Sequence, residues 1–300
     1  MSLYGVFPVL QTPFDDLGQM DETCLRREVD WVFEAGAAGV TVAMVSEILR
    51  LEHDERRELA GLVCDAAAAR GPVVISVGAE STAVAVRLAE HAQAVGAAAV
   101  MAIPPVSVTA SEAELYDYYE ALLTSTELPV VVQDASSYVG SHLPIGVMAR
   151  LHESHPERVY FKPEAQPLGP RLSALLAATS GCARALDGSG GVALIETHRR
   201  GLVGSMPAAD VCWAVVRMWR ALEKGDYDSA YQVSLPLSAL LAVQTSLDSY
   251  IAVEKYLLVK QKVFESRERR GPLEFKLDEI TTAHVDKLFG MLQAACGHAG

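Results

Sequence analysis

Eight short apolar segments, separated by longer amphipathic segments, are the feature that most constrains the fold of this 300-residue chain. Most of the eight lack an alternation of apolar and polar residues, as expected for parallel strands covered on both faces. Several intervening segments end at glycine, a common helix stop. The eight segments span residues 4–11, 38–44, 72–78, 98–105, 128–134, 158–162, 182–188 and 201–206. Strand and helix alternating eight times predict an α/β fold, the (β/α)8 TIM barrel.

The alternation stops after this point, and three apolar-periodic helices are predicted near residues 207–223, 226–265 with a break at Pro236, and 277–295. The first of these helices would close the barrel. We therefore place the barrel in residues 1–224 and a C-terminal helical extension in residues 225–300. The stretch 266–276, SRERRGPLEFK, is rich in charge, and we expect it to form a solvated loop.

The charge of the chain argues against nucleic acid or an anionic membrane as a partner. Its formal net charge is -13, whereas both partners require clustered lysine and arginine. The chain opens without a signal-peptide pattern, and no uncharged apolar run reaches the roughly 18 residues that a membrane span needs. Its five scattered cysteines match neither a disulfide framework nor a zinc spacing. We expect a cytoplasmic protein that binds a small molecule.

The position of one lysine points to chemistry. Lys162, in the segment VYFKPEA, is the only lysine among the first 223 residues and ends the sixth predicted strand. Barrel enzymes place their catalytic groups at the carboxyl ends of strands. Side chains alternate along a strand, so Tyr160 and Lys162 should both face the barrel axis. Burial there favours a neutral amine that attacks a ketone to form a Schiff base. The alternative is a structural lysine that pairs with Glu164 or extends to the rim.

Further segments accompany this lysine in a fixed order. They are PVLQTPFDDLGQMD at residues 8–21, SEILRLEHDER at 46–56, ELYDYYEAL before LPVVVQD, and the Phe-Lys pair of the sixth strand. Together they resemble the dihydrodipicolinate synthase and N-acetylneuraminate lyase superfamily, and the resemblance covers nearly the whole chain. It implies that Lys162 is the Schiff-base lysine and that the chain is a divergent member.

The resemblance implies a class I lyase or hydro-lyase that acts on pyruvate or a 2-keto(-3-deoxy) acid. It implies no metal or organic cofactor, and a homo-oligomer, either a dimer or a tetramer. The double proline at 104–105 resembles the keto-deoxy-glucarate dehydratase branch, which fits a 2-keto-3-deoxy sugar acid. Two other functions stay open: a relative that binds a keto acid or sugar acid without catalysis, and a barrel enzyme that uses Asp134 or Glu164 without an imine.

The second strand departs from the family pattern. Members usually carry Gly-Thr-Thr-Gly-Glu there, whereas residues 43–47 read AMVSE, so both threonines are missing. We expect the backbone N–H groups of Val45 and Ser46 to bind the substrate carboxylate, with Ser46 restoring one hydroxyl. The alternative for Met44 and Val45 is plain packing in the barrel.

The fifth strand also departs from the pattern, because Gln133 stands where the family has a proton-transferring tyrosine. An amide binds a substrate oxygen but does not exchange protons near neutral pH. We therefore consider Tyr160 as a catalytic replacement; alternatively it fills a barrel layer, with its hydroxyl bonded elsewhere. Tyr138 stands where many synthases have an arginine, and we expect it to contact the substrate.

Two later positions complete the predicted substrate contacts. Gly188 belongs to a glycine-rich turn after the seventh strand, where barrels often bind anions through loop amides, although such a segment is also typical of a simple turn. Val203, in the eighth strand, is the other predicted contact. Metal ligands are not expected.

Overall fold

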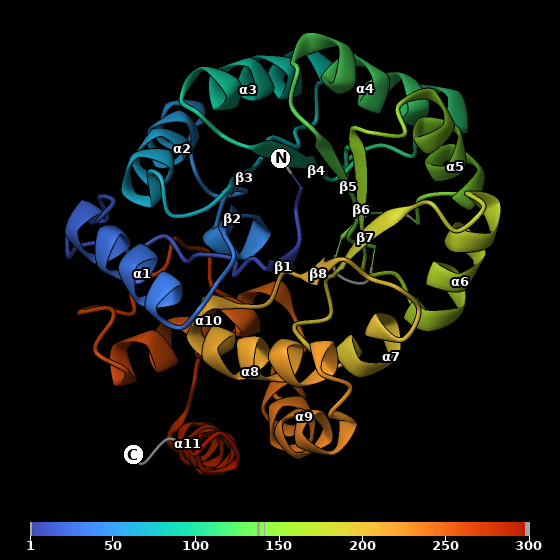
Figure 1. The fold of residues 1–300 in the computed structure, drawn as a ribbon. Helices are drawn as coiled ribbons and strands as arrows, with labels where there is room; N and C mark the ends of the chain where they lie inside the picture. The colour runs from blue at the N-terminus through green and yellow to red at the C-terminus, as the bar shows by residue number, and fades with distance from the viewer. Residues whose placement is uncertain (1, 137–138, 141, 298–300) are drawn as a thin grey trace.

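The computed structural model describes residues 2–136, 139–140 and 142–297, and within them eight parallel strands form a ring surrounded by helices (Figure 1). Every predicted strand is present. The strands are β1 (Gly5–Val6), β2 (Val40–Val42), β3 (Val73–Ser76), β4 (Ala99–Ala102), β5 (Val130–Asp134), β6 (Val159–Pro163), β7 (Arg184–Asp187) and β8 (Gly204–Ser205).

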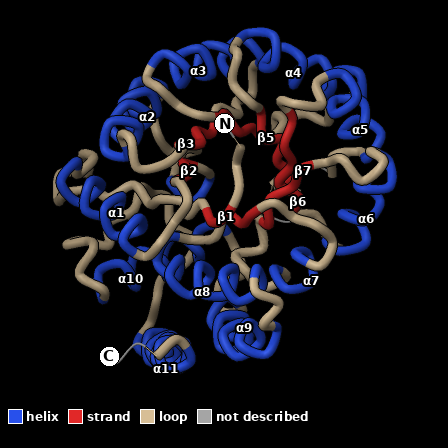
Figure 2. The backbone as a smooth tube through the Cα atoms, in the orientation of Figure 1, coloured by secondary structure: helices blue, strands red, loops and turns tan. Residues whose placement is uncertain are grey.

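Hydrogen bonds connect the strands in the order β1-β8-β7-β6-β5-β4-β3-β2. The first and last strands of this order meet through a parallel bridge between Val9 and Thr41, and the Leu10 N–H donates to the Thr41 carbonyl at 2.9 Å. Figure 2 shows the strands as an inner ring and the helices as an outer one. The predicted (β/α)8 barrel is therefore confirmed.

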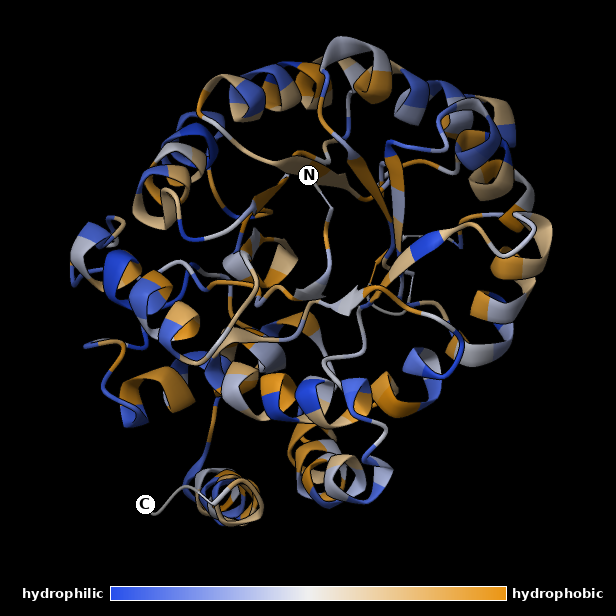
Figure 3. Cartoon of the chain, in the orientation of Figure 1, coloured by the Kyte–Doolittle hydropathy of each residue, from blue (hydrophilic) through white to orange (hydrophobic). Residues whose placement is uncertain are grey.

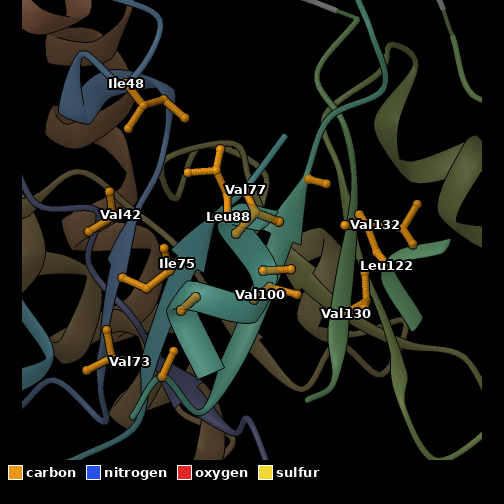
Figure 4. Packing of buried hydrophobic residues seen from close by; sticks show 14 of the residues in the cluster. Val42, Ile48, Val73, Ile75, Val77, Leu88, Val100, Leu122, Val130 and Val132 are labelled. Atoms are coloured by element: carbon orange, nitrogen blue, oxygen red, sulfur yellow. The ribbon is translucent and has the colours of Figure 1, made fainter. Parts of the chain in front are cut away.

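Side chains of the strands pack on both faces of the sheet. One cluster joins strand residues such as Val73, Ile75 and Val130 to helix residues such as Leu88 and Leu122 (Figure 4). A second cluster fills the barrel interior and takes alternate strand positions: Val74, Met101, Val131, Tyr160 and Leu186. Burial on both faces explains why the strands read as continuous apolar runs.

The helices around the barrel carry both hydrophobic and hydrophilic residues, as Figure 3 shows. Side chains of Asp21 and Ser111 cap the first and fourth helices by accepting hydrogen bonds from backbone N–H groups. The helices are α1 (Glu22–Glu34), α2 (His53–Ala67), α3 (Thr82–Ala94), α4 (Glu112–Ser125), α5 (Ile145–Ser154), α6 (Leu168–Ala178), α7 (Leu194–His198) and α8 (Cys212–Glu223).

Three more helices follow, α9 (Tyr227–Leu241), α10 (Leu247–Lys260) and α11 (Glu279–Ala295), and α9 and α11 share an apolar cluster with α8. The expected break at Pro236 is wrong, because α9 continues through this proline. The chain breaks instead at 242–246, where the Ser246 hydroxyl caps α10. Within the described residues, none of the helices has the length and apolar character to cross a membrane.

The segment 266–276 is a largely exposed loop, as expected, but two of its arginines are partly buried and bind carboxylates. The Arg269 guanidinium lies 3.2 Å from Asp248, and the Arg270 guanidinium lies 2.6 Å from Glu55. The Arg270 backbone N–H donates to a carboxylate oxygen of Glu47 at 2.8 Å. The sequence shows the charge of this segment but not the carboxylates that it meets in the fold.

A buried ion pair joins α10 to the loop after β2. The Lys255 Nζ lies 2.6 Å from Glu47 Oε1, and the two side chains are 1% and 0% exposed. Glu47 ends the short turn η1 (Met44–Ser46) with a φ of 58°, which is uncommon for a residue with a side chain. The C-terminal extension therefore holds this turn in place.

We predict that Lys255→Ala lowers the free energy of unfolding by about 3 kcal/mol, because it removes the cation in direct contact with the buried Glu47 carboxylate and, among the described residues, leaves only Arg50, at 3.8 Å. Lys260→Ala is the matched control on the same helix. Lys260 is 40% exposed and pairs with Asp286 at the surface, so its loss should cost below about 1 kcal/mol. Urea unfolding of both variants measures the difference, and equal losses would contradict a structural role for the buried pair.

Candidate active site

A cavity lies at the carboxyl ends of the strands, where the barrel wall meets α10. It has a free volume of about 60 Å³, room for roughly four waters or a short organic acid. Residues from β1, β2, β5, β6, β7 and β8 or the loops after them line it together with the extension: Val9, Ala43, Met44, Val45, Gln133, Lys162, Glu164, Gly188, Gly190, Met206, Ala208, Leu241, Leu247, Tyr250 and Glu254. The predicted residues Lys162, Gln133, Val45 and Gly188 are thus brought together.

Lys162 lies in this cavity next to a buried carboxylate. Its Nζ is 3.1 Å from Glu164 Oε1, and both side chains are only 5% exposed. The second carboxylate oxygen of Glu164 accepts a hydrogen bond of 2.7 Å from the Gln133 amide. The lysine is therefore paired with Glu164, as the structural alternative expected, but it also has an open cavity beside it.

Burial raises the pKa of the Glu164 carboxyl, whereas Lys162 and the Gln133 amide lower it in part. Gly188 makes room for this carboxyl. A Cβ at Gly188 would overlap Glu164 Cγ and lie 2.9 Å from the carboxyl carbon. The glycine after β7 thus has a steric role that the sequence does not show.

The same turn is tied internally, because the Ser189 hydroxyl and the Gly191 N–H both donate to the Asp187 carboxylate. Its Gly191 amide is committed to the protein rather than to an anion. The observation favours the simple-turn alternative for this segment.

Met44 and Val45 of the η1 turn also line the cavity. Ser46 does not, which corrects the prediction for this residue. Its N–H donates to the Ala43 carbonyl at 3.0 Å, and its hydroxyl accepts from the Ala43 N–H while donating to the Leu10 carbonyl. The N–H groups of Met44 and Val45 precede the first hydrogen bond of the turn, the usual place for unpaired donors.

Tyr160 and Val203 lie at the other end of the barrel, and both predictions are corrected. The Tyr160 hydroxyl accepts hydrogen bonds from Arg184, at the start of β7, and from the Leu3 N–H, at 3.1 and 3.4 Å. Its ring faces inward as expected, but the side chain extends toward the amino ends of the strands. Val203 pairs there with Gly5, and Met206 lines the cavity instead. Tyr138 lies outside the described residues.

Asp134, a candidate for catalysis without an imine, is also held away from the cavity. Arg171 lies 2.9 Å from its Oδ2, and the Ser136 hydroxyl donates to its Oδ1 at 2.5 Å. It does not line the cavity. Its geometry is that of a structural ion pair.

The extension contributes a carboxyl that sequence reasoning missed. Glu254, on α10, lines the cavity and is fully buried, and one of its oxygens accepts a hydrogen bond from the Gln11 amide. The same Gln11 donates its backbone N–H to Glu28 at 2.9 Å. Burial and the nearby Asp210 raise the pKa of Glu254 well above its ordinary value. No sequence signal ties a residue so far along the chain to the mouth of the barrel.

Asp210 and Glu28 are equally enclosed. Burial raises the pKa of Asp210 to about 7, against the weaker effect of two backbone N–H groups, and raises that of Glu28 well above its usual range. Neither oxygen of Asp210 accepts a hydrogen bond of ordinary geometry from any group in the described ranges. Burial of a carboxyl without donors of ordinary geometry favours its protonated form.

The comparisons with known proteins agree with this geometry. The profile of the Dihydrodipicolinate synthetase family matches residues 2–288. L-2-keto-3-deoxyarabonate dehydratase of Azospirillum brasilense is 29% identical over 90% of this chain and 88% of its own. The 4-hydroxy-tetrahydrodipicolinate synthase of Agrobacterium fabrum is 28% identical over 99% and 98%.

Solved structures match along the full length as well. The 4-hydroxy-tetrahydrodipicolinate synthase of Methylacidiphilum fumariolicum superposes with a TM-score of 0.90 at 23% identity, covering 99% of this chain and 98% of that one. A prophage protein of the dihydrodipicolinic acid synthase family from E. coli K12, in complex with pyruvate, gives 0.88 at 23%, covering 98% and 99%. At these identities both similarities show the fold alone.

We predict that Gly188→Ala destabilises the protein by about 1–3 kcal/mol, because the new methyl group must displace the buried Glu164 side chain. Gly61→Ala on α2 is the control. A Cβ there meets nothing within 4 Å, so it should be neutral or stabilise by up to about 1 kcal/mol. Urea unfolding compares the two, and a neutral Gly188→Ala would show that the carboxyl has room to move.

We predict that Asp210→Asn stabilises the protein more at pH 8 than at pH 5. The pKa of Asp210 is raised in the folded state to about 7. The stability that its protonated form gives the folded state is therefore fully present below the unfolded pKa of 3.8 and is lost as pH rises through 7. Replacing the acid removes a cost of up to about 4 kcal/mol at high pH. Urea unfolding at both pH values measures it, with the exposed Asp117→Asn as control; a gain equal at both would contradict the assignment.

Proposed function

The chain belongs to the dihydrodipicolinate synthetase family of lyase-type enzymes, and we propose that it forms a Schiff base between Lys162 and the ketone of pyruvate or another 2-keto acid. The observation that carries this proposal is a buried amine at the mouth of the barrel, with a carboxylate at 3.1 Å and an open cavity beside it. A lysine that served only the fold would need the ion pair but not the cavity.

Glu164 is the proton partner of the lysine in this proposal. It accepts a proton from the Lys162 ammonium, and the neutral amine then attacks the ketone carbon, so that the C=O π pair becomes the carbinolamine hydroxyl after proton transfer. The protonated Glu164 returns its proton to that hydroxyl, which leaves as water while the nitrogen lone pair forms the C=N bond. Gln133 orients the carboxyl through its amide and takes no proton itself.

The N–H groups of Met44 and Val45 receive the substrate carboxylate in this arrangement. Two features support the assignment: both residues line the cavity, and both precede the first hydrogen bond of the η1 turn. Backbone donors need no particular side chain, which is consistent with the absence of threonine here. Ser46 and Glu47 act by holding the turn.

The cavity favours a 2-keto-3-deoxy acid and a hydro-lyase reaction. Lys162 is the only cationic side chain among the described lining residues, and its neighbours include Val9, Met206 and Leu247. A substrate with a second carboxylate would find no cation for it there. A chain of neutral hydroxyl groups fits better, and one relative of nearly full length is a 2-keto-3-deoxy acid dehydratase. No observation favours a binding-only relative.

We also propose that the protein is cytoplasmic, forms a homo-oligomer, either a dimer or a tetramer, and divides into a barrel at 1–224 and an extension at 225–300. All five cysteines are free, which is in keeping with a reducing compartment. The family resemblance supports the oligomer, and the interval between α8 and α9 supports the boundary. The net charge of -13 continues to argue against nucleic acid as a partner.

We predict that borohydride with pyruvate adds one reduced pyruvyl group to the wild-type chain, at Lys162, and none to Lys162→Ala. Lys224→Ala, an exposed lysine, should be modified like the wild type. Glu164→Gln should slow the modification by about 100-fold, because the amine loses its proton acceptor. Intact-mass and peptide mass spectrometry measure all four proteins. Modification of Lys162→Ala at the wild-type rate would contradict the proposal.

A further inference from the structure

We propose that Glu254 is the catalytic acid–base group that moves the proton at C3 of the Schiff base, an inference that rests on the function proposed above. Glu254 lies on α10, outside the strands that carry Lys162, Gln133 and Glu164, and it lines the same cavity as these residues. It is close enough to Lys162 for the two to interact electrostatically. Its side chain is therefore placed to reach the carbons that follow the imine.

Glu164 is less suited to this second step. Lys162 lies at one of its oxygens and the Gln133 amide at the other, so both oxygens are directed to the nitrogen end of the substrate. The Gln133 amide does not exchange protons in a useful range, and the Tyr160 hydroxyl lies at the far end of the barrel. Chemistry at C3 requires another group, and α10 supplies a carboxyl.

The surroundings of Glu254 suit a group that both gives and takes a proton. Asp210 and Glu28 lie near it, and the burial of these three carboxyls opposes ionisation of the set. Gln11 connects two of them, through its side-chain amide to Glu254 and its backbone N–H to Glu28. A carboxyl whose pKa is raised by burial is a stronger base toward carbon, and is more often protonated and available as an acid, than one exposed to water.

The step is balanced without a co-reactant. The C3–H bond of the imine breaks, and its proton passes to the Glu254 carboxylate. The pair from that bond forms C2=C3, while the C=N π pair becomes the nitrogen lone pair of an enamine. In the reverse direction Glu254 returns a proton to C3 and restores the imine. In D2O, exchange of the acid with solvent replaces the methyl hydrogens of pyruvate by deuterium.

Proton NMR of pyruvate in D2O, together with borohydride modification, tests this assignment. In Glu254→Gln, which keeps the shape and an oxygen to accept from Gln11, we expect modification of Lys162 within about twofold of wild type and methyl exchange slower by about 100-fold or more. Glu223→Gln, on the outer helix α8, is the matched control and should leave both rates unchanged. Glu254→Asp, which moves the carboxyl by one methylene, should slow exchange about tenfold and serves if the amide variant does not fold.

The outcomes separate this proposal from the one it rests on. If the wild type is not modified at Lys162, the Schiff base itself is wrong. If the wild type is modified but Glu254→Gln exchanges methyl hydrogens at the wild-type rate, the imine stands and the role of Glu254 is overturned. Tyr250 lies one helical turn before Glu254 and also lines the cavity. Loss of exchange in Tyr250→Phe, with normal exchange in Glu254→Gln, would transfer the role to the phenol.

Discussion

The contact between Lys162 and Glu164 is the constraint on which the rest of the site depends. Two opposite charges buried inside a barrel stay there only when geometry and further hydrogen bonds offset the loss of water. Three features meet this condition: a distance of 3.1 Å, the Gln133 amide on the free carboxylate oxygen, and the absence of a side chain at Gly188. The cavity beside the pair leaves room for a small molecule next to the amine.

The C-terminal extension is part of this site rather than an appendage. Two consecutive residues of α10 reach different walls of the mouth: Glu254 lines the cavity, and Lys255 pairs with Glu47 behind the η1 turn. Glu47 ends the η1 turn in a left-handed backbone conformation. Lys255 fixes the Glu47 carboxylate, and this contact also fixes the turn whose N–H groups lie at the cavity. A barrel of eight strands alone would lack both the second carboxyl and the support of this turn.

Local sequence patterns predicted the features that residues close together in the chain determine. The eight apolar segments gave the strands, and the end of the sixth strand gave Lys162 its place at the mouth. Tyr160 shows the limit: alternation correctly put it inside the barrel, but its direction along the axis depends on Arg184 in the next strand. The role of Ser46 and the partners of Arg270 were missed for a related reason, since the groups that they contact lie elsewhere in the sequence. Glu254 had no local signal at all.

Burial raises the pKa of both carboxyls of the cavity, but their charged neighbours differ, and this difference supports the roles proposed for them. Lys162 at 3.1 Å and the Gln133 amide offset part of the burial effect on the pKa of Glu164, whereas Asp210 adds to the burial effect on the pKa of Glu254. In the proposed mechanism Glu164 therefore exchanges a proton with the nitrogen, and Glu254 exchanges one with the carbon. The same pattern restricts the substrate, because burying a second substrate carboxylate without a cation costs several kcal/mol. The substrate proposed above, a 2-keto acid whose remaining chain is neutral, avoids this cost.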